Sequence, residues 1–123
     1  MRKLILIVLI MFGLFGSSSG QQISHIIERN GWYRLYDQDG KYYTNISMIE
    51  GQMVTYTSGY FILYRNGWYY LYNTQGKKYK TLDANQLGEI VASTSVGFTT
   101  ENNGWLYTYD IQGNKINTRS VNE

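Results

Sequence analysis

Apolar and polar residues alternate with a period of two in several short runs of this chain, and Gly-containing turns separate the runs. The clearest run begins with Asn-Gly-Trp and occurs three times, at residues 30–40, 66–76 and 103–113. Because successive side chains of a β-strand point to opposite faces, this alternation predicts strands. Asn-Gly is a strong hairpin signal, since both residues adopt positive φ readily. Each copy therefore predicts a tight turn, an aromatic strand and a second Gly turn.

Each complete repeat predicts an antiparallel meander of four strands. The expected strands are 52–58, 60–65, 68–73 and 77–82 in the second repeat, and 89–95, 98–102, 105–110 and 114–119 in the third. The polar link 83–88 predicts a loop or a single helical turn. The first repeat lacks its first strand, which would fall at residues 16–22, and keeps a strand at 23–29, one from Trp32 and one at 41–47.

The three Trp residues define the repeat period. Residues 51–83 match residues 88–120 at an offset of 37, and Trp32 precedes Trp68 by 36 residues. Four-stranded antiparallel repeats occur in propeller blades, trefoils and barrels. We expect an all-β fold of three tandem meander repeats with about eleven strands, which is blade-like or curled into a barrel. A trefoil is less favoured, because its hairpins are longer. Either the chain ends pair, or an open edge pairs with a second chain.

The first 20 residues predict a secretory signal peptide. A basic head at Arg2 and Lys3 precedes an apolar run at residues 4–16 and a small-residue exit at 17–20. The run is shorter than the roughly 20 residues of a membrane span, and an uncleaved anchor is the alternative. We expect a secreted or periplasmic bacterial protein that makes no membrane contact after cleavage.

The remaining residues, 21–123, are expected to form a single repeat domain with units at about 21–50, 51–87 and 88–123. Nine basic and nine acidic residues remain there, since Arg2 and Lys3 belong to the leader. This balance gives no electrostatic footprint for nucleic acid. Cysteine is absent, so an exported domain must depend on its own core, and its 13 Tyr and three Trp make that core aromatic.

The Trp-x-Tyr-x-Tyr pattern provides the candidate binding residues. Side chains two apart share a strand face, and flat aromatic faces with hydroxyl groups at their rim suit the apolar faces of sugar rings. The alternative is that these residues form the core between repeats. The candidate ligand-binding residues are Trp32, Tyr36, Trp68, Tyr70, Tyr72, Trp105, Tyr107 and Tyr109. In the first copy Arg34 replaces the middle Tyr.

The segment from Asn66 to Leu71, Asn-Gly-Trp-Tyr-Tyr-Leu, followed by Gly76, resembles the aromatic hairpin of bacterial choline-binding and glucan-binding cell-wall repeats. In that family, aromatic residues of successive hairpins hold choline groups or glucan chains. The resemblance implies ligand contacts at Trp68, Tyr70 and Tyr72 and at Trp105, Tyr107 and Tyr109. Hairpins of that family follow one another at about half the present spacing, and this chain has two further strands in each repeat.

Catalytic and metal chemistry is poorly represented. His25 is the only histidine, so neither a His-based triad nor a His metal cluster is available. Residues 37–40, Asp-Gln-Asp-Gly, differ from a calcium loop in the position of Gly, and a turn-forming Asx side chain is the better interpretation. No pair of carboxylates stands out, and no Gly-rich phosphate loop is present. We therefore expect no enzyme activity, no cofactor and no metal.

Two functions remain open. The first is an exported, non-catalytic β-repeat module that binds cell-wall or surface glycan through its aromatic hairpins. The alternative is a structural or protein-interaction module that assembles through open sheet edges, as a homo-oligomer or with another protein. Exposed aromatic rings would favour the first function, and an unpaired strand edge would favour the second.

Overall fold

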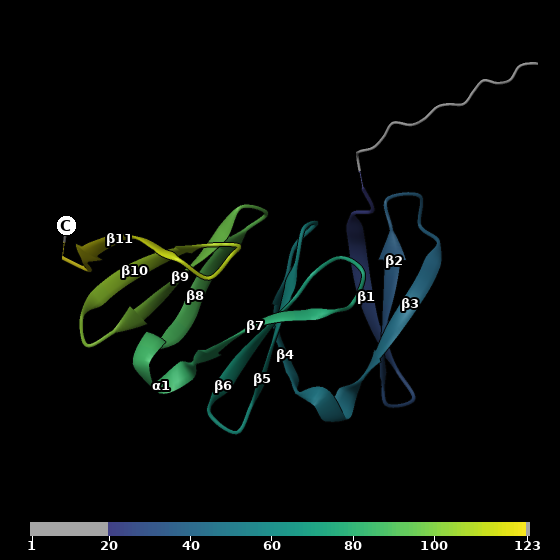
Figure 1. Ribbon diagram of the computed structural model, residues 1–123, viewed down its shortest axis with the longest axis horizontal. Coiled ribbons are helices and arrows are strands. Elements are labelled where there is room, and N and C mark those ends of the chain that lie inside the picture. Colours follow the sequence, from purple (N-terminus) through teal and green to yellow (C-terminus); the bar gives the residue numbers. More distant parts are fainter. Residues whose placement is uncertain (1–19, 123) are drawn as a thin grey trace, which may run out of the picture.

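The computed structural model describes residues 20–122, which form three small antiparallel sheets stacked in chain order (Figure 1). The sheets contain three, four and four strands, and each is a meander in which neighbouring strands follow one another in the sequence. The strands are β1 (Ile23–Arg29), β2 (Trp32–Asp37), β3 (Tyr42–Ser47), β4 (Gln52–Tyr56), β5 (Phe61–Arg65), β6 (Trp68–Tyr72), β7 (Lys78–Asp83), β8 (Glu89–Thr94), β9 (Gly97–Asn102), β10 (Trp105–Asp110) and β11 (Lys115–Ser120). The all-β fold of tandem meanders is confirmed, and the described sheets do not close into a barrel.

Each sheet contains one Asn-Gly hairpin. The Asn residues at positions 30, 66 and 103 have φ of 52°, 53° and 54°, and the Gly after each has φ of 85° to 89°. Positive φ at both central residues defines the type I′ turn, whose twist matches that of the flanking strands. Asn is the side-chain-bearing residue that enters this region at lowest cost. The three predicted hairpins are therefore confirmed.

A single turn of α-helix, α1 (Ala84–Leu87), links the second sheet to the third. The carboxylate of Asp83 caps this turn by accepting a hydrogen bond from a backbone N–H, and Gly88 ends it with φ of 93°. An added Cβ at Gly88 would lie 2.2 Å from the carbonyl oxygen of Glu101, so this position requires Gly. The 3₁₀ turn η2 (Met48–Glu50) occupies the same place after the first sheet. The polar link is thus a helical turn.

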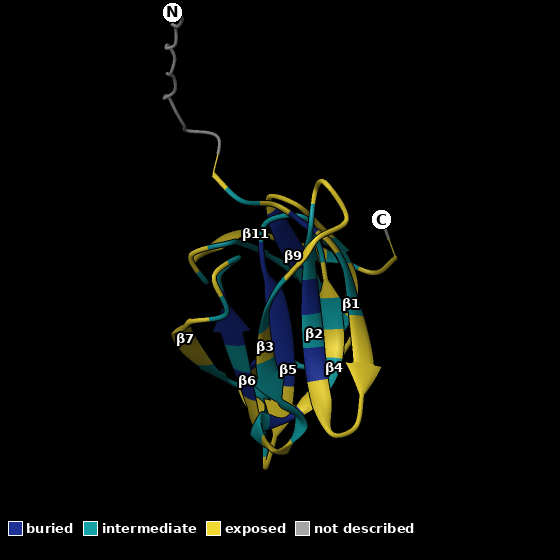
Figure 2. Cartoon of the chain, turned by 90° about the vertical axis from the view of Figure 1, so that its right-hand side faces the viewer, coloured by how far each residue is buried: buried dark blue, intermediate teal, exposed yellow. Residues whose placement is uncertain are grey.

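The central sheet buries both of its faces, and buried residues are concentrated on the middle strands of the stack (Figure 2). The core between the first two sheets contains Ile23, Tyr33, Leu35, Phe61, Leu63 and Tyr72. The core between the last two sheets contains Tyr60, Ile62, Tyr69, Leu71, Leu87 and Phe98. Because side chains alternate along β5 and β6, consecutive residues of these strands serve different cores. This explains why these strands are nearly continuous hydrophobic runs.

Tyr hydroxyl groups join each sheet to the next. The donors and their accepting carbonyls are Tyr33 to Gly51, Tyr43 to Thr74, Tyr60 to Gly97, Tyr69 to Gly88 and Tyr79 to Ile111. Burial raises the pKa of these side chains, and it raises the pKa of Tyr60 to about 12. Much of the high Tyr content therefore holds the repeats together.

The outer face of the third sheet, the last sheet among the described residues, differs from the faces that join one sheet to the next. At the repeat positions of the sheet-joining Tyr residues stand Leu106 and Ile116. Thr99 and Thr108 replace buried aliphatic residues, and their hydroxyl oxygens lie 3.2 Å apart in a hydrogen bond. The outer face of the third sheet therefore lacks the Tyr hydroxyl groups and part of the buried aliphatic surface that join the other sheets.

The first and last strands belong to different sheets, so the ends of the described chain do not pair with each other. The predicted signal peptide lies outside the described residues except for Gly20. Among residues 20–122, no helix has the length and apolar character needed to cross a membrane.

Candidate functional site

The three Trp residues occupy one repeated position at the surface. Trp32, Trp68 and Trp105 each begin the middle strand of a sheet, directly after its Asn-Gly turn. Their side chains are 43%, 43% and 47% exposed. The type I′ turn sets this exposure, since the Trp that follows it lies at the turn end of its sheet, beyond the core between the sheets. We call these three side chains the Trp row.

Polar residues flank each ring of the Trp row across the sheet. The partners on the two neighbouring strands are Arg29 and Ser47 for Trp32, Arg65 and Asp83 for Trp68, and Asn102 and Ser120 for Trp105. Side chains directly opposite on antiparallel strands lie close enough to interact. Each apolar ring is therefore bordered by hydrogen-bonding groups.

The middle aromatic position carries a cation over its ring. Lys78 Nζ lies 4.6 Å from the centroid of Tyr70, and Lys115 Nζ lies 5.0 Å from the centroid of Tyr107. In the first sheet the cation and the aromatic residue have exchanged positions: Arg34 stands where the other sheets have Tyr, and Tyr42 stands where they have Lys. The guanidinium of Arg34 lies 5.2 Å from the centroid of the Tyr42 ring. Sequence reasoning missed these pairs. The repeat alignment contained the signal, because the cation and the aromatic residue exchange positions together.

The last Tyr of the Trp-x-Tyr-x-Tyr pattern, which we call the inner position, belongs to the core in the second and third sheets. Tyr72 is only 5% exposed and stacks on Phe61, with ring centroids 4.9 Å apart. Tyr109 is half-buried and stacks on Phe98 at 5.3 Å. The predicted line of three aromatic residues thus divides into an exposed Trp, a Tyr beneath a cation and a Tyr packed between sheets.

The first sheet differs, because no sheet covers its outer face within the described residues. There Tyr36 stacks on His25, with centroids 4.5 Å apart, and both rings remain partly exposed. Arg34 and Tyr42 lie on the same face, and Tyr42 is 5.8 Å from Tyr36. Of the inner positions, Tyr36 is thus the one that retains an open face.

The Asp and Asn side chains at the second Gly turn of each repeat accept hydrogen bonds from the backbone. Asp37 Oδ1 accepts hydrogen bonds from the N–H groups of Asp39 and Lys41, at 2.9 and 3.0 Å. Asn73 and Asp110 make the same pair of bonds in their turns. This geometry confirms the interpretation of these residues as Asx turns. Within residues 20–122, His, Asp and Glu side chains form no group of three that could hold a metal ion.

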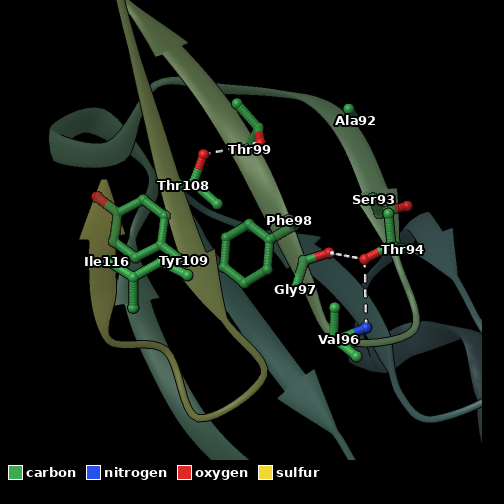
Figure 3. Close-up of a pocket in the computed structure, with 10 residues that line it drawn as sticks. All are labelled: Ala92, Ser93, Thr94, Val96, Gly97, Phe98, Thr99, Thr108, Tyr109 and Ile116. Atoms are coloured by element: carbon green, nitrogen blue, oxygen red, sulfur yellow. Dashed lines mark hydrogen bonds between the residues drawn. The ribbon is translucent and has the colours of Figure 1, made fainter. Parts of the chain in front are cut away.

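The third sheet contains an open cavity of about 140 Å³ (Figure 3). Its lining includes Phe98, Tyr109 and Ile116, together with the hydrogen-bonded pair Thr99 and Thr108. Hydroxyl groups of Ser and Thr residues line it, but no carboxylate, imidazole or amine lines it that could act as a base toward them. It contains only one of the sequence-predicted site residues, Tyr109.

Comparisons with known proteins give no relative: no family model, no curated protein and no solved structure matches this chain.

Proposed function

We propose that this protein is an exported, non-catalytic binding module of a bacterial cell, and that it engages cell-wall or surface glycan through the Trp row. One observation carries the proposal: the Trp side chain at this position is 43% to 47% exposed in all three repeats, although in the second sheet Tyr70 is half-buried and Tyr72 is buried on the same strand. An aromatic ring bordered by polar groups suits a sugar, which presents an apolar face and hydroxyl groups at its edge.

The stacking of the sheets favours a polymeric ligand over a single sugar. Packed sheets lie about 10 Å apart, so rings of equivalent position on adjacent sheets are separated by at least that distance. One monosaccharide cannot span two such rings, whereas a glycan chain contacts several in succession. Binding at one ring then raises the effective concentration of the chain at the next ring.

The proposal is tested by titrating the full chain with soluble peptidoglycan fragments and with soluble glucans, while recording Trp fluorescence. All three Trp residues belong to the row, so the signal comes from the proposed site alone. We expect a saturable change, and we expect Trp68→Ala or Trp105→Ala to weaken binding about tenfold, or about 1.4 kcal/mol.

Ile49→Ala is the matched control, because Ile49 is 77% exposed and lies outside the Trp row. This variant should bind with unchanged affinity. A flat fluorescence response to every glycan, or equal affinity of Trp68→Ala and the unsubstituted chain, would refute glycan binding by the Trp row.

A second candidate function, a protein-interaction module, is favoured by one specific observation. The first sheet has three strands where the other two sheets have four, so among the described residues no strand pairs with the outer edge of β1, although the N–H of Ile23 at its start donates to the carbonyl of Ser58. An unpaired edge is a template for a strand of another chain. The signature of this function is binding of an extended polypeptide with no effect on the Trp row.

A further inference from the structure

Among residues 20–122, the first sheet lacks one strand that the other two sheets have. In the second sheet β4 pairs with β5, and in the third sheet β8 pairs with β9, both antiparallel. The repeat equivalent of β5 and β9 is β1, and within the described residues β1 pairs only with β2. The molecule therefore shows twice which element fits against this edge.

The turn after β1 decides which backbone groups face the open edge. Arg29 and Trp32 flank the two-residue turn, and residues in that position exchange both of their hydrogen bonds with each other. Along a strand, the backbone N–H and C=O groups of alternate residues point to opposite edges. Those of Arg29 point toward β2, so those of Glu28 and Ile26 point toward the open edge. Their equivalents in the second sheet, Ile62 and Tyr64, are the residues that pair with β4.

The second wall of this space is the face of β4 toward the first sheet. Met53 packs on the core between the first two sheets, and Tyr56 shares its face and is 41% exposed. At the next interface the residue equivalent to Tyr56 is Ser93, whose hydroxyl bonds Thr55 of the preceding sheet's first strand at 2.6 Å. Tyr56 has no such strand beside it among the described residues. We call the space between the β1 edge and Tyr56 the β1 notch.

We propose that the β1 notch binds one extended peptide segment of a partner protein, antiparallel to β1, as the fourth strand of the first sheet. The inference does not depend on glycan binding, and it gives the second candidate function its site and its ligand. Side-chain burial agrees with it, because Ile26 is partly exposed whereas its equivalent Ile62 is fully buried beside β4. A strand in the notch would complete that burial.

A single strand fits this site better than a second folded copy. In the second sheet β4 lies beyond β5, the repeat equivalent of β1. Antiparallel pairing of two β1 edges would therefore bring the β4 strands of both copies to the same edge, where they would compete for one space. The chain's own equivalent residues, Gly-Ser-Ser-Ser-Gly at positions 16–20, contain no β-branched or aromatic residue and have low strand propensity. The partner segment should resemble β4, with alternating apolar and hydroxyl side chains.

The test uses a fluorescently labelled peptide with the sequence of residues 51–58, and its binding to the full chain is followed by fluorescence anisotropy. In this register a Gln lies opposite Glu28 and a Thr lies opposite Ile26, as their equivalents do in the second sheet. We expect saturable binding. A peptide N-methylated at the Thr that corresponds to Thr55 should bind at least tenfold more weakly, because it loses a ladder hydrogen bond. N-methylation at the Met that corresponds to Met53, whose N–H points away from the edge, is the control.

On the protein, Glu28→Pro removes an outward N–H without removing a bond to β2, and Glu28→Ala is the matched control for the lost charge. We expect at least tenfold weaker peptide binding by Glu28→Pro and unchanged binding by Glu28→Ala and by Trp68→Ala. Absence of saturable binding up to about 1 mM peptide, or equal binding of the two N-methylated peptides, would overturn the proposal. The N-methylated peptides decide the outcome even where Glu28→Pro fails to fold.

Discussion

The hydroxyl group of Tyr60 offers the sharpest test of how the sheets are joined. This side chain is fully buried between the second and third sheets, and its hydroxyl donates to the carbonyl oxygen of Gly97 at 2.8 Å. Tyr60→Phe removes the hydroxyl group and leaves the ring in place. The carbonyl of Gly97 is itself buried, so the substitution leaves an acceptor that water cannot reach easily.

The expected loss of stability follows from this geometry. Losing a buried hydrogen bond costs about 1 kcal/mol, and up to about 3 kcal/mol where the acceptor keeps no other donor. Here Gly97 is paired with Thr94 across a two-residue turn, so its carbonyl keeps a backbone partner. Thr94 Oγ1 lies 3.4 Å from the same oxygen, which is long for a hydrogen bond and compensates only in part. We therefore expect Tyr60→Phe to lower the free energy of unfolding by about 1–2 kcal/mol. For a domain of this size, the melting temperature should fall by roughly 4–16 °C.

Thermal and urea unfolding, followed by far-UV circular dichroism, measure this effect. Tyr79→Phe is the matched control, since Tyr79 also donates across a sheet interface, to Ile111, but at an exposed position. We expect Tyr79→Phe to change stability by less than about 0.5 kcal/mol. Equal losses for the two variants, or no loss for Tyr60→Phe, would refute the argument that burial sets the value of these bonds.

Three further predictions test other features of the fold. Burial raises the pKa of Tyr60 to about 12, above the unfolded value near 10, so its contribution to stability is complete below about pH 10 and is lost as the pH rises to about 12. Tyr60 should account for about 2–3 kcal/mol of the decline in unfolding free energy over this range, and Tyr60→Phe should reduce the decline by that amount in urea unfolding. Gly88→Ala should destabilise the fold by several kcal/mol more than Gly104→Ala, because a Cβ at Gly88 meets backbone atoms whereas one at Gly104 meets nothing within 4 Å. The midpoints of urea unfolding compare the two variants, and equal midpoints would contradict the clash at Gly88. A double-mutant cycle with Lys78→Met and Tyr70→Leu should give a coupling energy of about 0.5–1 kcal/mol, and a value near zero would show that this contact does not stabilise the fold.

Local sequence features were sufficient to predict the strands and turns. Asn-Gly pairs and the period-two alternation act within a few residues, so the chain could be divided into meanders without knowledge of packing. The strand β10 and the first strand β1 have the predicted bounds, and other strands differ by one or two residues at their ends. The helical turn after Asp83 was one of two predicted alternatives, and its capping carboxylate decided between them.

The candidate aromatic face could be predicted only in part. Alternation correctly placed Trp68, Tyr70 and Tyr72 on one side of β6, because the side-chain period of a strand is fixed. It could not show that Tyr72 is buried and Trp68 is half-exposed, since that difference depends on how far the neighbouring sheet extends along the strand. The cations over Tyr70 and Tyr107 likewise come from an adjacent strand whose register the sequence leaves open.

The sequence by itself therefore determined the repeat period, the hairpins and the missing strand of the first repeat, all of which depend on short-range backbone preferences and residue spacing. The tertiary structure alone decided that the repeats stack face to face as three separate sheets, joined by Tyr hydroxyl groups. It also decided which aromatic rings remain at the surface. The physical reason is that burial depends on contacts between sheets. Several of those contacts join residues more than 30 positions apart, which is beyond the range of a local sequence pattern.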